Sequence, residues 1–481
     1  MIFGGVGLRA ARARGAAGAR DSGTWLGSMN FLRRPDYLFL VFSTFFGLIL
    51  CFELPPLGGG NEMYNLQRAA SIAYGHPLVE EAEVPSGISE FITAGFTFFH
   101  EGLSQPFSYS RDEYRKVAAI PLRASEPVAL SPNAIAVHHP FSYIPQALVL
   151  RLGAVFNASP LKLFYLARLG GLLSSIALTF LAIRLAPSRQ YAFCALALLP
   201  SITFARSCVD ADPVTNGLAF LFIACMLREI ARSGPVSMRS LALLALLAFV
   251  VGQCKSAYFV LLLLALAIPQ ARFVSRFSWL TWMGILILPG IVASVGWMLL
   301  VKQSYFTGVS YHTYSGEVDP DRQLAFILGH PFAYLATFLR TLFMTPFFPQ
   351  ALLGILGGFG PGLFIPMPVL VVVVGLLFGV IAAHRTGAGA TYPGVGSLTA
   401  VIFLAFIGLS LTILYIQWTG FGLPVIEGFS GRYFFPLLPL LLLFAKPPEK
   451  PMPMAPGVGV TALACAGLPF MLWSTLQAYY G

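Results

Sequence analysis

Residues 54–76 read LPPLGGGNEMYNLQRAASIAYGH, and they directly follow the first apolar run of membrane-spanning length, Tyr37 to Phe52. The stretch contains two prolines, three consecutive glycines and the carboxylate of Glu62, and Glu53 immediately precedes it. A lipid-facing helix tolerates none of these features, because unpaired backbone groups and charges are costly in hydrocarbon. The stretch is therefore either a connector outside the membrane or part of a functional site.

The composition excludes a soluble globular protein. Of the 481 residues, 57% are hydrophobic and only 10% are charged, whereas charged residues make up about a quarter of a soluble domain. Apolar runs that can cross about 30 Å of hydrocarbon recur along the chain, which predicts helices rather than a barrel as the spanning elements. We therefore expect an all-α polytopic integral membrane protein.

The formal net charge of +10 comes from basic residues that are scattered through short loops. This distribution predicts orientation in a membrane and no binding of nucleic acid. The cysteines lie within or at the ends of apolar segments, with no CxxC motif and no metal-type spacing: residues 51, 194, 208, 225, 254 and 465. Neither a disulfide framework nor a zinc site is predicted.

The first 34 residues are rich in Arg, Gly and Ala and predict a disordered basic tail in the cytoplasm. The apolar run after this tail ends without the small residues of a cleavage site, so a cleavable signal is not expected. Met1 and Met29 are both compatible with the start of the chain.

A cytoplasmic N-terminus places a long first loop, residues 54–161, on the outer face. Its apolar piece Tyr143–Phe156 is short and contains Arg151, so we expect an interfacial helix on the outer surface. Residues 302–366 form a second outer loop, with apolar pieces at 331–348 and 351–359 that are either a helical hairpin or a re-entrant pair. The remaining predicted spans lie near residues 163–186, 190–205, 213–230, 240–252, 256–269, 279–301, 366–384, 397–417, 432–445 and 457–477.

This topology has about 11 spans, or 13 if the hairpin crosses the membrane. Residues 35–301 then form the core with the first outer loop, and residues 367–481 hold the C-terminal spans. Sixteen of the twenty acidic residues face outward, all except Asp21, Asp36, Glu229 and Glu449. Acidic residues contribute little to orientation, so their distribution indicates a working outer face. No internal repeat is visible, which argues against a secondary transporter.

Four polar clusters share a position on this outer side, at the ends of apolar runs: Glu53 with Asn61 and Glu62; Arg206 with Asp210 and Asp212; Lys255 with Tyr258; and Arg432 with Tyr433. A carboxylate there is suited to take a proton from a hydroxyl group, and the basic residues are suited to bind a phosphate. Each feature also has an ordinary structural explanation. Asp212 precedes Pro213 and suits a helix N-cap, and an interfacial Lys255 suits a snorkelling side chain.

The glycine run and a histidine pair complete the candidate features. The run at residues 58–60 allows the backbone to approach a ligand closely. His138 and His139 are also placed outside, but adjacent residues do not share a helix face, so a two-histidine metal site is not expected.

Several of these stretches resemble a known family. The run PP followed by NEMYNLQRA resembles the PPDE-x-x-H-F-x-R-A signature of a large family of predicted bacterial polytopic membrane proteins related to the GT-C glycosyltransferases. The likeness covers roughly residues 37–445. Other similar segments follow in the same order: NAIAVHHPFSYIPQ, Ala167-Arg168-Leu169, ALLPSITFARSCVDADPVTN, KSAYFVLLLLALAIP, DPDRQLAFILGHPFAYL, GGFGPGLFIP and GFSGRYFFPLLPLLL.

The resemblance implies a GT-C-like fold in the bacterial inner membrane. GT-C enzymes take a sugar from a polyprenyl-phosphate or polyprenyl-diphosphate carrier and transfer it outside the membrane, using an acidic residue in the first outer loop. The Asp-Glu positions of the signature fall on Asn61 and Glu62, so an amide stands where the pattern has a carboxylate. The second acid matches Asp210 or Asp212. The residues expected at the substrate are Asn61, His138, Arg168, Arg206, Lys255, Tyr258, Arg432 and Tyr433.

The leading hypothesis is a transferase in which Glu62 deprotonates the hydroxyl of a glycan or lipid acceptor. Arg206, Lys255 and Arg432 would stabilise the departing lipid phosphate. No cofactor is certain; Mg²⁺ or Mn²⁺ bridging Glu62 and Asp210 is an open alternative, although hard cations prefer more carboxylates. Two other classes stay open: a transporter or flippase of lipid-linked sugars, and a catalytically inactive protein of envelope assembly, which Asn61 favours.

Overall fold

The computed structural model describes residues 34–78, 82–102, 111–130, 135, 137–187, 189–307, 312–313, 316–360, 363–383, 394–444 and 455–480. These residues are mostly helical, with three small two-stranded sheets among them. Apart from Arg34, the predicted basic tail at residues 1–34 lies outside this part of the chain.

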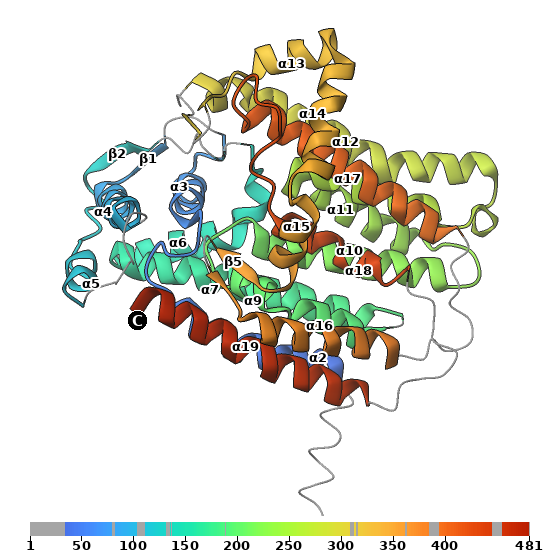
Figure 1. Ribbon diagram of the computed structural model, residues 1–481, viewed down its shortest axis with the longest axis horizontal. Helices are drawn as coiled ribbons and strands as arrows, with labels where there is room; N and C mark the ends of the chain where they lie inside the picture. Colours follow the sequence, from blue (N-terminus) through green and yellow to red (C-terminus); the bar gives the residue numbers. More distant parts are fainter. Residues whose placement is uncertain are drawn as a thin grey trace, which may run out of the picture.

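Six helices in the described ranges are long and apolar enough to cross a membrane. They run in roughly parallel or antiparallel directions and form the body of the molecule (Figure 1). Their bounds are α2 (Pro35–Glu53), α7 (Pro160–Leu185), α10 (Asp212–Ala231), α12 (Arg276–Thr307), α17 (Val395–Gln417) and α19 (Pro456–Tyr480). The expectation of a helical membrane protein is therefore confirmed, while the total of 11 to 13 spans stays a prediction.

Shorter elements occupy the other predicted spans, and η4 follows one of them. They are α8 (Gln190–Ala197), α9 (Pro200–Arg206), α11 (Met238–Cys254), the 3₁₀ helices η3 (Ser256–Ala267), η4 (Gln270–Arg272) and η5 (Gly431–Leu437), α16 (Met367–Ala383) and α18 (Leu438–Leu441). The predicted span near residues 190–205 consists of two helices. Pro200 has no N–H for the helix ladder, so α8 ends before it and α9 begins at it.

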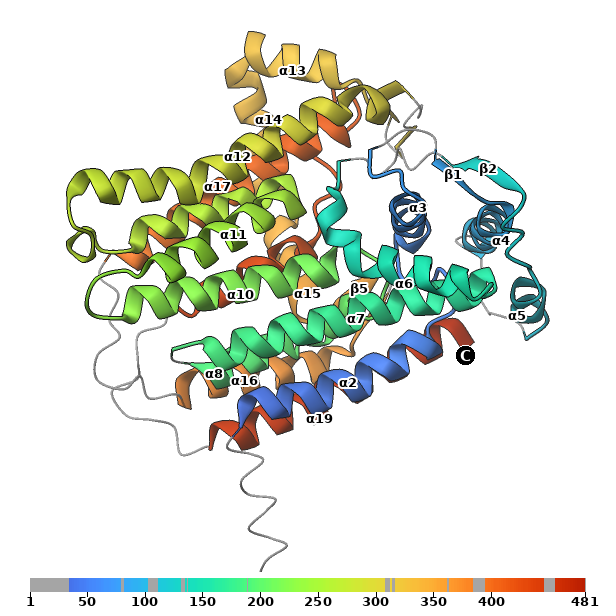
Figure 2. The same cartoon turned by 180° about the vertical axis from the view of Figure 1, so that it is seen from behind.

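The first outer loop folds into a group of small elements at one end of the long helices (Figures 1 and 2). They are α3 (Glu62–Ala73), β1 (Ala82–Pro85), α4 (Ser86–Gly102), α5 (Arg111–Ala118), β2 (Pro127–Leu130), η2 (Pro140–Tyr143) and α6 (Ile144–Val155). Strands β1 and β2 pair antiparallel, with Ala82 opposite Leu130. Helix α6 packs against α7 and α3.

Helix α6 matches the predicted amphipathic segment. Its buried face includes Gln146 and Leu150, whereas Ile144, Leu148 and Leu152 are about half exposed. An exposed apolar stripe on a short helix suits a position at the membrane surface.

The second outer region contains the small strands and three helices. Their bounds are β3 (His312–Thr313), β4 (Gly316–Glu317), α13 (Pro320–Gly329), α14 (Pro331–Met344), α15 (Phe347–Leu356), β5 (Gly358–Gly360) and β6 (Leu363–Phe364). Helices α13 and α14 meet at an angle of 109°. Helices thus form at both predicted apolar pieces, and whether they cross the membrane or re-enter stays a prediction.

The core is organised around α7, which packs against α10, α6 and α2, while α19 packs against α16 and α2. Helix η5 packs against α15, and Gly431 and Gly354 allow their backbones to come close. A Cβ atom on Gly431 would overlap the backbone oxygen of Ala351 and the Cα atom of Gly354. This close approach fixes the position of Arg432, which is the next residue in η5.

We therefore predict that Gly431→Ala destabilises the protein by about 1–3 kcal/mol, because the added methyl group meets backbone that cannot rotate away. Thermal unfolding of the purified protein in detergent measures this effect. Gly408→Ala in α17 is the control, since nothing lies within 4 Å of a Cβ atom there. Equal unfolding temperatures for both variants would contradict the proposed tight contact.

Candidate functional site

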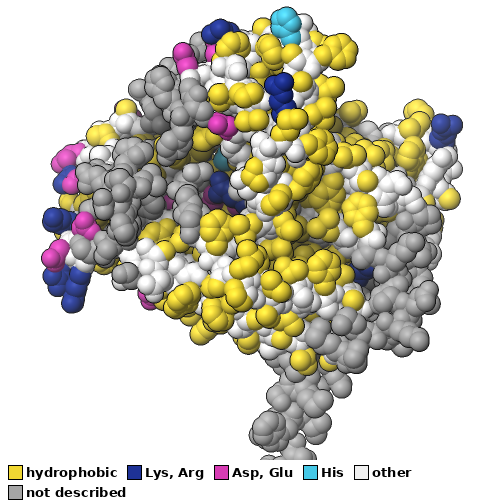
Figure 3. Space-filling view, viewed as in Figure 1, with side chains coloured by type: hydrophobic (Ala, Val, Ile, Leu, Met, Phe, Trp, Pro, Cys, Tyr) yellow, Lys and Arg dark blue, Asp and Glu magenta, His cyan; other side chains and the backbone are white. Residues whose placement is uncertain are grey.

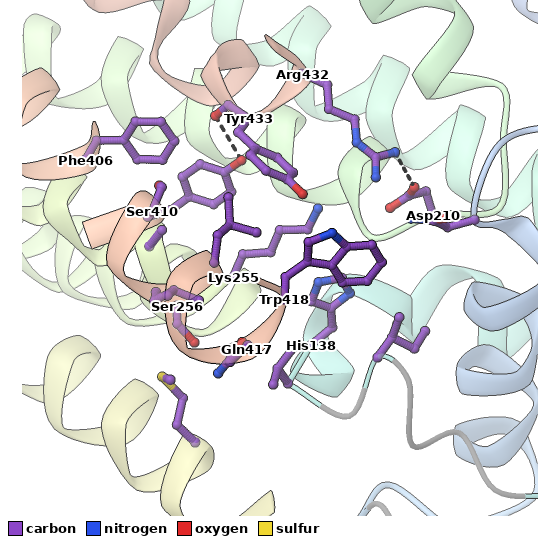
Figure 4. A pocket seen from close by; sticks show the side chains of 18 of the residues that line it. His138, Asp210, Lys255, Ser256, Phe406, Ser410, Gln417, Trp418, Arg432 and Tyr433 are labelled. Carbon is purple, nitrogen blue, oxygen red and sulfur yellow. Dashed lines mark hydrogen bonds and ion pairs between the residues drawn. The ribbon is translucent and has the colours of Figure 1, made fainter. Parts of the chain in front are cut away.

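Side chains from all four predicted polar clusters line one cavity of about 200 Å³. The cavity lies among the start of α3, the loop before α10, the turn between α11 and η3, and η5 (Figure 4). Of the residues named from the sequence, those that line it are Asn61, His138, Asp210, Lys255, Tyr258, Arg432 and Tyr433. The tertiary structure thus brings together segments that are more than 300 residues apart.

Two carboxylates and two cations form a balanced ion-pair group at this cavity. Lys255 Nζ contacts Asp212 Oδ1, and Arg432 Nη1 lies 3.4 Å from Asp210 Oδ2. Arg432 Nε is also 4.0 Å from Asp212 Oδ2, an oxygen that has no hydrogen-bond partner among the described residues. The Arg432 side chain is 30% exposed, so it is the most accessible charge of the group.

The local sequence explains how the two carboxylates come to lie side by side. Asp212 is the first residue of α10 and not its predicted N-cap, which is Ala211, and Pro213 follows at a position where a helix does not need an N–H donor. The backbone N–H of Asp212 donates to Asp210 Oδ1 at 3.2 Å. The N-terminus of α10 therefore helps to hold Asp210 at the wall of the cavity.

The surroundings of the cavity change the pKa values of two of its groups. Burial and the neighbouring charge of Asp212 raise the pKa of the Asp210 carboxyl group, although Lys255 and Arg432 oppose the shift. Burial and the charge of Lys255 hold the pKa of His138 well below its usual value. At neutral pH the histidine is therefore uncharged, and Asp210 binds a proton more readily than an ordinary aspartate does.

Two further cavities adjoin the first. One of about 580 Å³ shares Asn61, Asp210, Trp418, Arg432 and Tyr433 with it, and its other walls are mostly apolar. Another of about 400 Å³ lies beyond Trp418. Figure 3 shows this face of the molecule, where charged side chains are visible in a hollow between hydrophobic ones. The ion-pair group thus borders a space large enough for a ligand with a sizeable apolar part.

Glu62 lies outside the cavity and is fully buried. Both of its carboxylate oxygens bind the Arg168 guanidinium, at 2.8 and 2.6 Å. Each oxygen also accepts one backbone N–H, from Val209 at 2.8 Å and from Gly59 at 2.9 Å. A carboxylate that accepts four hydrogen bonds, two of them from the fully buried Arg168, joins segments of the structure. This geometry favours a structural role for Glu62 over the predicted role of general base.

The glycine run allows one of these contacts of Glu62. A Cβ atom on Gly59 would overlap the Glu62 carboxylate and Cys208 Sγ, so glycine allows its own N–H group to reach the carboxylate. Gly59 and Gly60 also line the cavity of about 580 Å³.

Two of the predicted phosphate-binding or substrate-binding arginines lie away from the cavity. Arg168 is occupied by Glu62 and by the carbonyl oxygens of Cys51, Leu54 and Pro55. Arg206 is buried in the helical body, where it donates to the hydroxyl groups of two serines and to a backbone carbonyl. Their positions in the sequence suggested accessible ends of spans, but both guanidinium groups connect elements of the core.

The donor set does not fit a divalent metal ion. Asp210 and Asp212 face Lys255 and Arg432, and a hard cation requires several free oxygen ligands. Within the described ranges, no group of three or more His, Cys, Asp or Glu side chains lies close enough together to hold a metal.

Comparison with known proteins places the chain in a family. The sequence profile of the family described as predicted membrane protein, DUF2142, matches residues 42–441. The chain belongs to the DUF2142 family. No curated protein and no solved structure matches it. The DUF2142 region includes every residue that lines the three cavities, and its description supports a membrane protein without naming an activity.

The sequence of this DUF2142 member did not single out Trp418, which lines all three cavities. A tryptophan at the end of an apolar helix is ordinarily an interface anchor, so only the fold shows its central position. Asn65 and Tyr143 were also missed as partners. They are 78 residues apart, and no spacing in the chain indicates their contact.

We predict that Glu62→Gln destabilises the protein by about 3–5 kcal/mol, because it leaves the Arg168 charge buried without a counter-charge. Thermal unfolding of single and double variants measures the effect. The double variant Glu62→Gln with Arg168→Met should lose less than the sum of the two single variants. Asp112→Asn, which breaks an exposed ion pair with Arg115, is the control and should change stability little. Strictly additive losses would show that the pair is not coupled.

Proposed function

We propose that this protein is a GT-C-like membrane glycosyltransferase. It transfers a sugar from a polyprenyl-phosphate donor to a hydroxyl group of a glycan or lipid acceptor on the outer face of the bacterial inner membrane. The observation that carries the proposal is the convergence of Lys255, Arg432 and Asp210 on one cavity that borders a larger apolar one. A lipid phosphate needs both environments, cations for its head and apolar walls for its chain.

The arrangement of charges suits displacement of a phosphate. Lys255 and Arg432 are positioned to neutralise the charge that develops on the phosphate oxygen as its bond to the anomeric carbon breaks. The acceptor oxygen forms the new bond to that carbon and gives up its proton. The two electrons of the broken bond stay with the phosphate, so charge and atoms balance.

Asp210 is the proposed acceptor of the proton. It lines the cavity, whereas Glu62 is enclosed by Arg168 and two backbone donors. Its raised pKa suits a base better than an unperturbed aspartate would. The donor phosphate would compete with Asp210 for Arg432 and leave the carboxylate free to act. No step requires a metal ion.

The proposed orientation has the N-terminus in the cytoplasm. Contacts join several of the segments that are predicted to face inward. Arg272 binds Glu229 and the carbonyl oxygen of Gly234, and Arg189 contacts the carbonyl oxygen of Leu442. The loops predicted to face outward meet instead at the cavity. These contacts support the proposed grouping of the basic loops on the cytoplasmic side.

A second candidate function is a catalytically inactive protein of envelope assembly. The enclosure of Glu62 favours it, because the acidic position implied by the family resemblance has no access to a substrate. The first candidate is preferred because a structural protein has no need for a cavity with two cations in its wall.

We predict that Asp210→Asn lowers sugar transfer at least 100-fold, the scale expected for loss of a general base. The assay uses purified protein in lipid nanodiscs with polyprenyl-phosphate hexoses as donors and measures sugar on the acceptor fraction. Thermal unfolding confirms that the variant is folded, and Asp112→Asn is the control with unchanged activity. Transfer at the parental rate by folded Asp210→Asn would reject the mechanism, and no transfer by the parent with any donor would favour the second candidate.

The rate of transfer should fall as the pH decreases through the raised pKa of Asp210, because the protonated carboxyl group cannot accept a proton. Lys255→Met removes a charge that lowers this pKa, so the acidic limb of the pH profile should move to higher pH. The measurement is the transfer rate across pH for both proteins. Lys302→Met, in an exposed pair with Asp321, should leave the limb unchanged. A shift of the Lys255→Met limb to lower pH would contradict the assignment.

A further inference from the structure

A chain of three hydrogen bonds runs from the start of α3 to the cavity. Asn65 Nδ2 lies 2.9 Å from the carbonyl oxygen of Asn61, and the Tyr143 hydroxyl lies 2.5 Å from Asn65 Oδ1. His138 Nδ1 then lies 3.1 Å from the Tyr143 hydroxyl oxygen. Asn65 and Tyr143 are buried, and His138 lines the cavity.

The donor and the acceptor of each of these three hydrogen bonds follow from the chemistry of the groups. A backbone carbonyl can only accept, so the Asn65 atom that faces Asn61 is the NH₂ group. The other Asn65 atom is therefore the amide oxygen, which also can only accept. Tyr143 has one hydroxyl proton, and it must point to Asn65. The Tyr143 oxygen is then left to accept, and its donor is the Nδ1–H group of His138.

The remaining histidine nitrogen consequently carries no proton. A neutral imidazole has one N–H, and here it is on Nδ1. Nε2 has no hydrogen-bond partner among the described residues. Figure 4 shows His138 among the side chains that line the cavity, together with Lys255 and Trp418. Burial and the charge of Lys255 disfavour a second proton on the ring, as do Arg432 and Arg68, while Asp212 opposes them.

We infer that Asn65 and Tyr143 hold His138 as its Nδ1–H tautomer, so that Nε2 is a fixed acceptor for a hydroxyl group of the substrate. The inference rests on the proposed function and names the part of the ligand that the cavity selects. An unprotonated ring nitrogen repels an anionic oxygen and attracts an O–H donor. The positive charges of Lys255 and Arg432 instead attract an anionic oxygen. The cavity therefore recognises a phosphate with a hydroxyl-bearing neutral group next to it, as in a sugar phosphate ester.

Nuclear magnetic resonance of the protein labelled with ¹⁵N-histidine tests the tautomer without any substrate. Loss of signals in His138→Gln assigns the residue. We expect the parent to show a protonated Nδ1 and an unprotonated Nε2. Tyr143→Phe removes the acceptor for Nδ1–H and should increase the Nε2–H form, which is a change that a purely structural role of Tyr143 would not predict. An Nε2–H form in the parent overturns the inference.

Binding measurements test the selection. In nanodiscs, the probes are polyprenyl phosphate alone and the same lipid carrying a hexose. His138→Ala and Tyr143→Phe should each lower the preference for the hexose-bearing lipid by roughly tenfold, while binding of the bare phosphate stays the same. An unchanged preference in both variants overturns the inference even if the bare lipid binds. Failure of the parent to bind either lipid rejects the proposed function instead. The tautomer of His138 measured by nuclear magnetic resonance does not depend on that outcome.

Discussion

The buried pair of Glu62 and Arg168 is the interaction on which the rest of the structure depends. Both side chains are fully excluded from solvent, and transfer of either charge alone into such a place would cost several kcal/mol. The cost is offset because every oxygen of Glu62 is paired, and because Arg168 also binds the carbonyl oxygens of three residues at the end of α2. One ion pair thereby joins α2, α3 and α7.

The same pair determines where the cavity forms. Glu62 Oε1 accepts the N–H of Val209, and the next residue is Asp210. Asn61 immediately precedes Glu62 and faces the cavity. Glu62 therefore joins the first and second polar clusters outside the cavity. Asn61 and Asp210, the residues next to these contacts, line the cavity, whereas Glu62 itself does not. The carboxylate that seems most reactive in the sequence is thus the one that the fold encloses most completely.

Opposite charges at the cavity stabilise one another in the free protein. An anionic ligand can replace a carboxylate as the partner of a cation. Asp210 and Asp212 balance Lys255 and Arg432, so neither cation is left uncompensated in a poorly hydrated place. The partly exposed Arg432 is the member that a phosphate reaches most readily. Its position depends on Gly431 and Gly354, which let η5 and α15 touch through their backbones.

The sequence by itself determined the class of the protein. Apolar length and the scarcity of charge predict membrane-spanning helices, and interruptions of the apolar runs predict the polar clusters at residues 61, 210, 255 and 432. These are local properties of the chain. The role of each polar residue depends instead on what packs beside it. Glu62 and Asp210 are both acids after an apolar run, and only tertiary contacts with Arg168 and Arg432 separate the enclosed carboxylate from the accessible one. The tautomer of His138 likewise follows from Asn65 and Tyr143, which only the fold brings together.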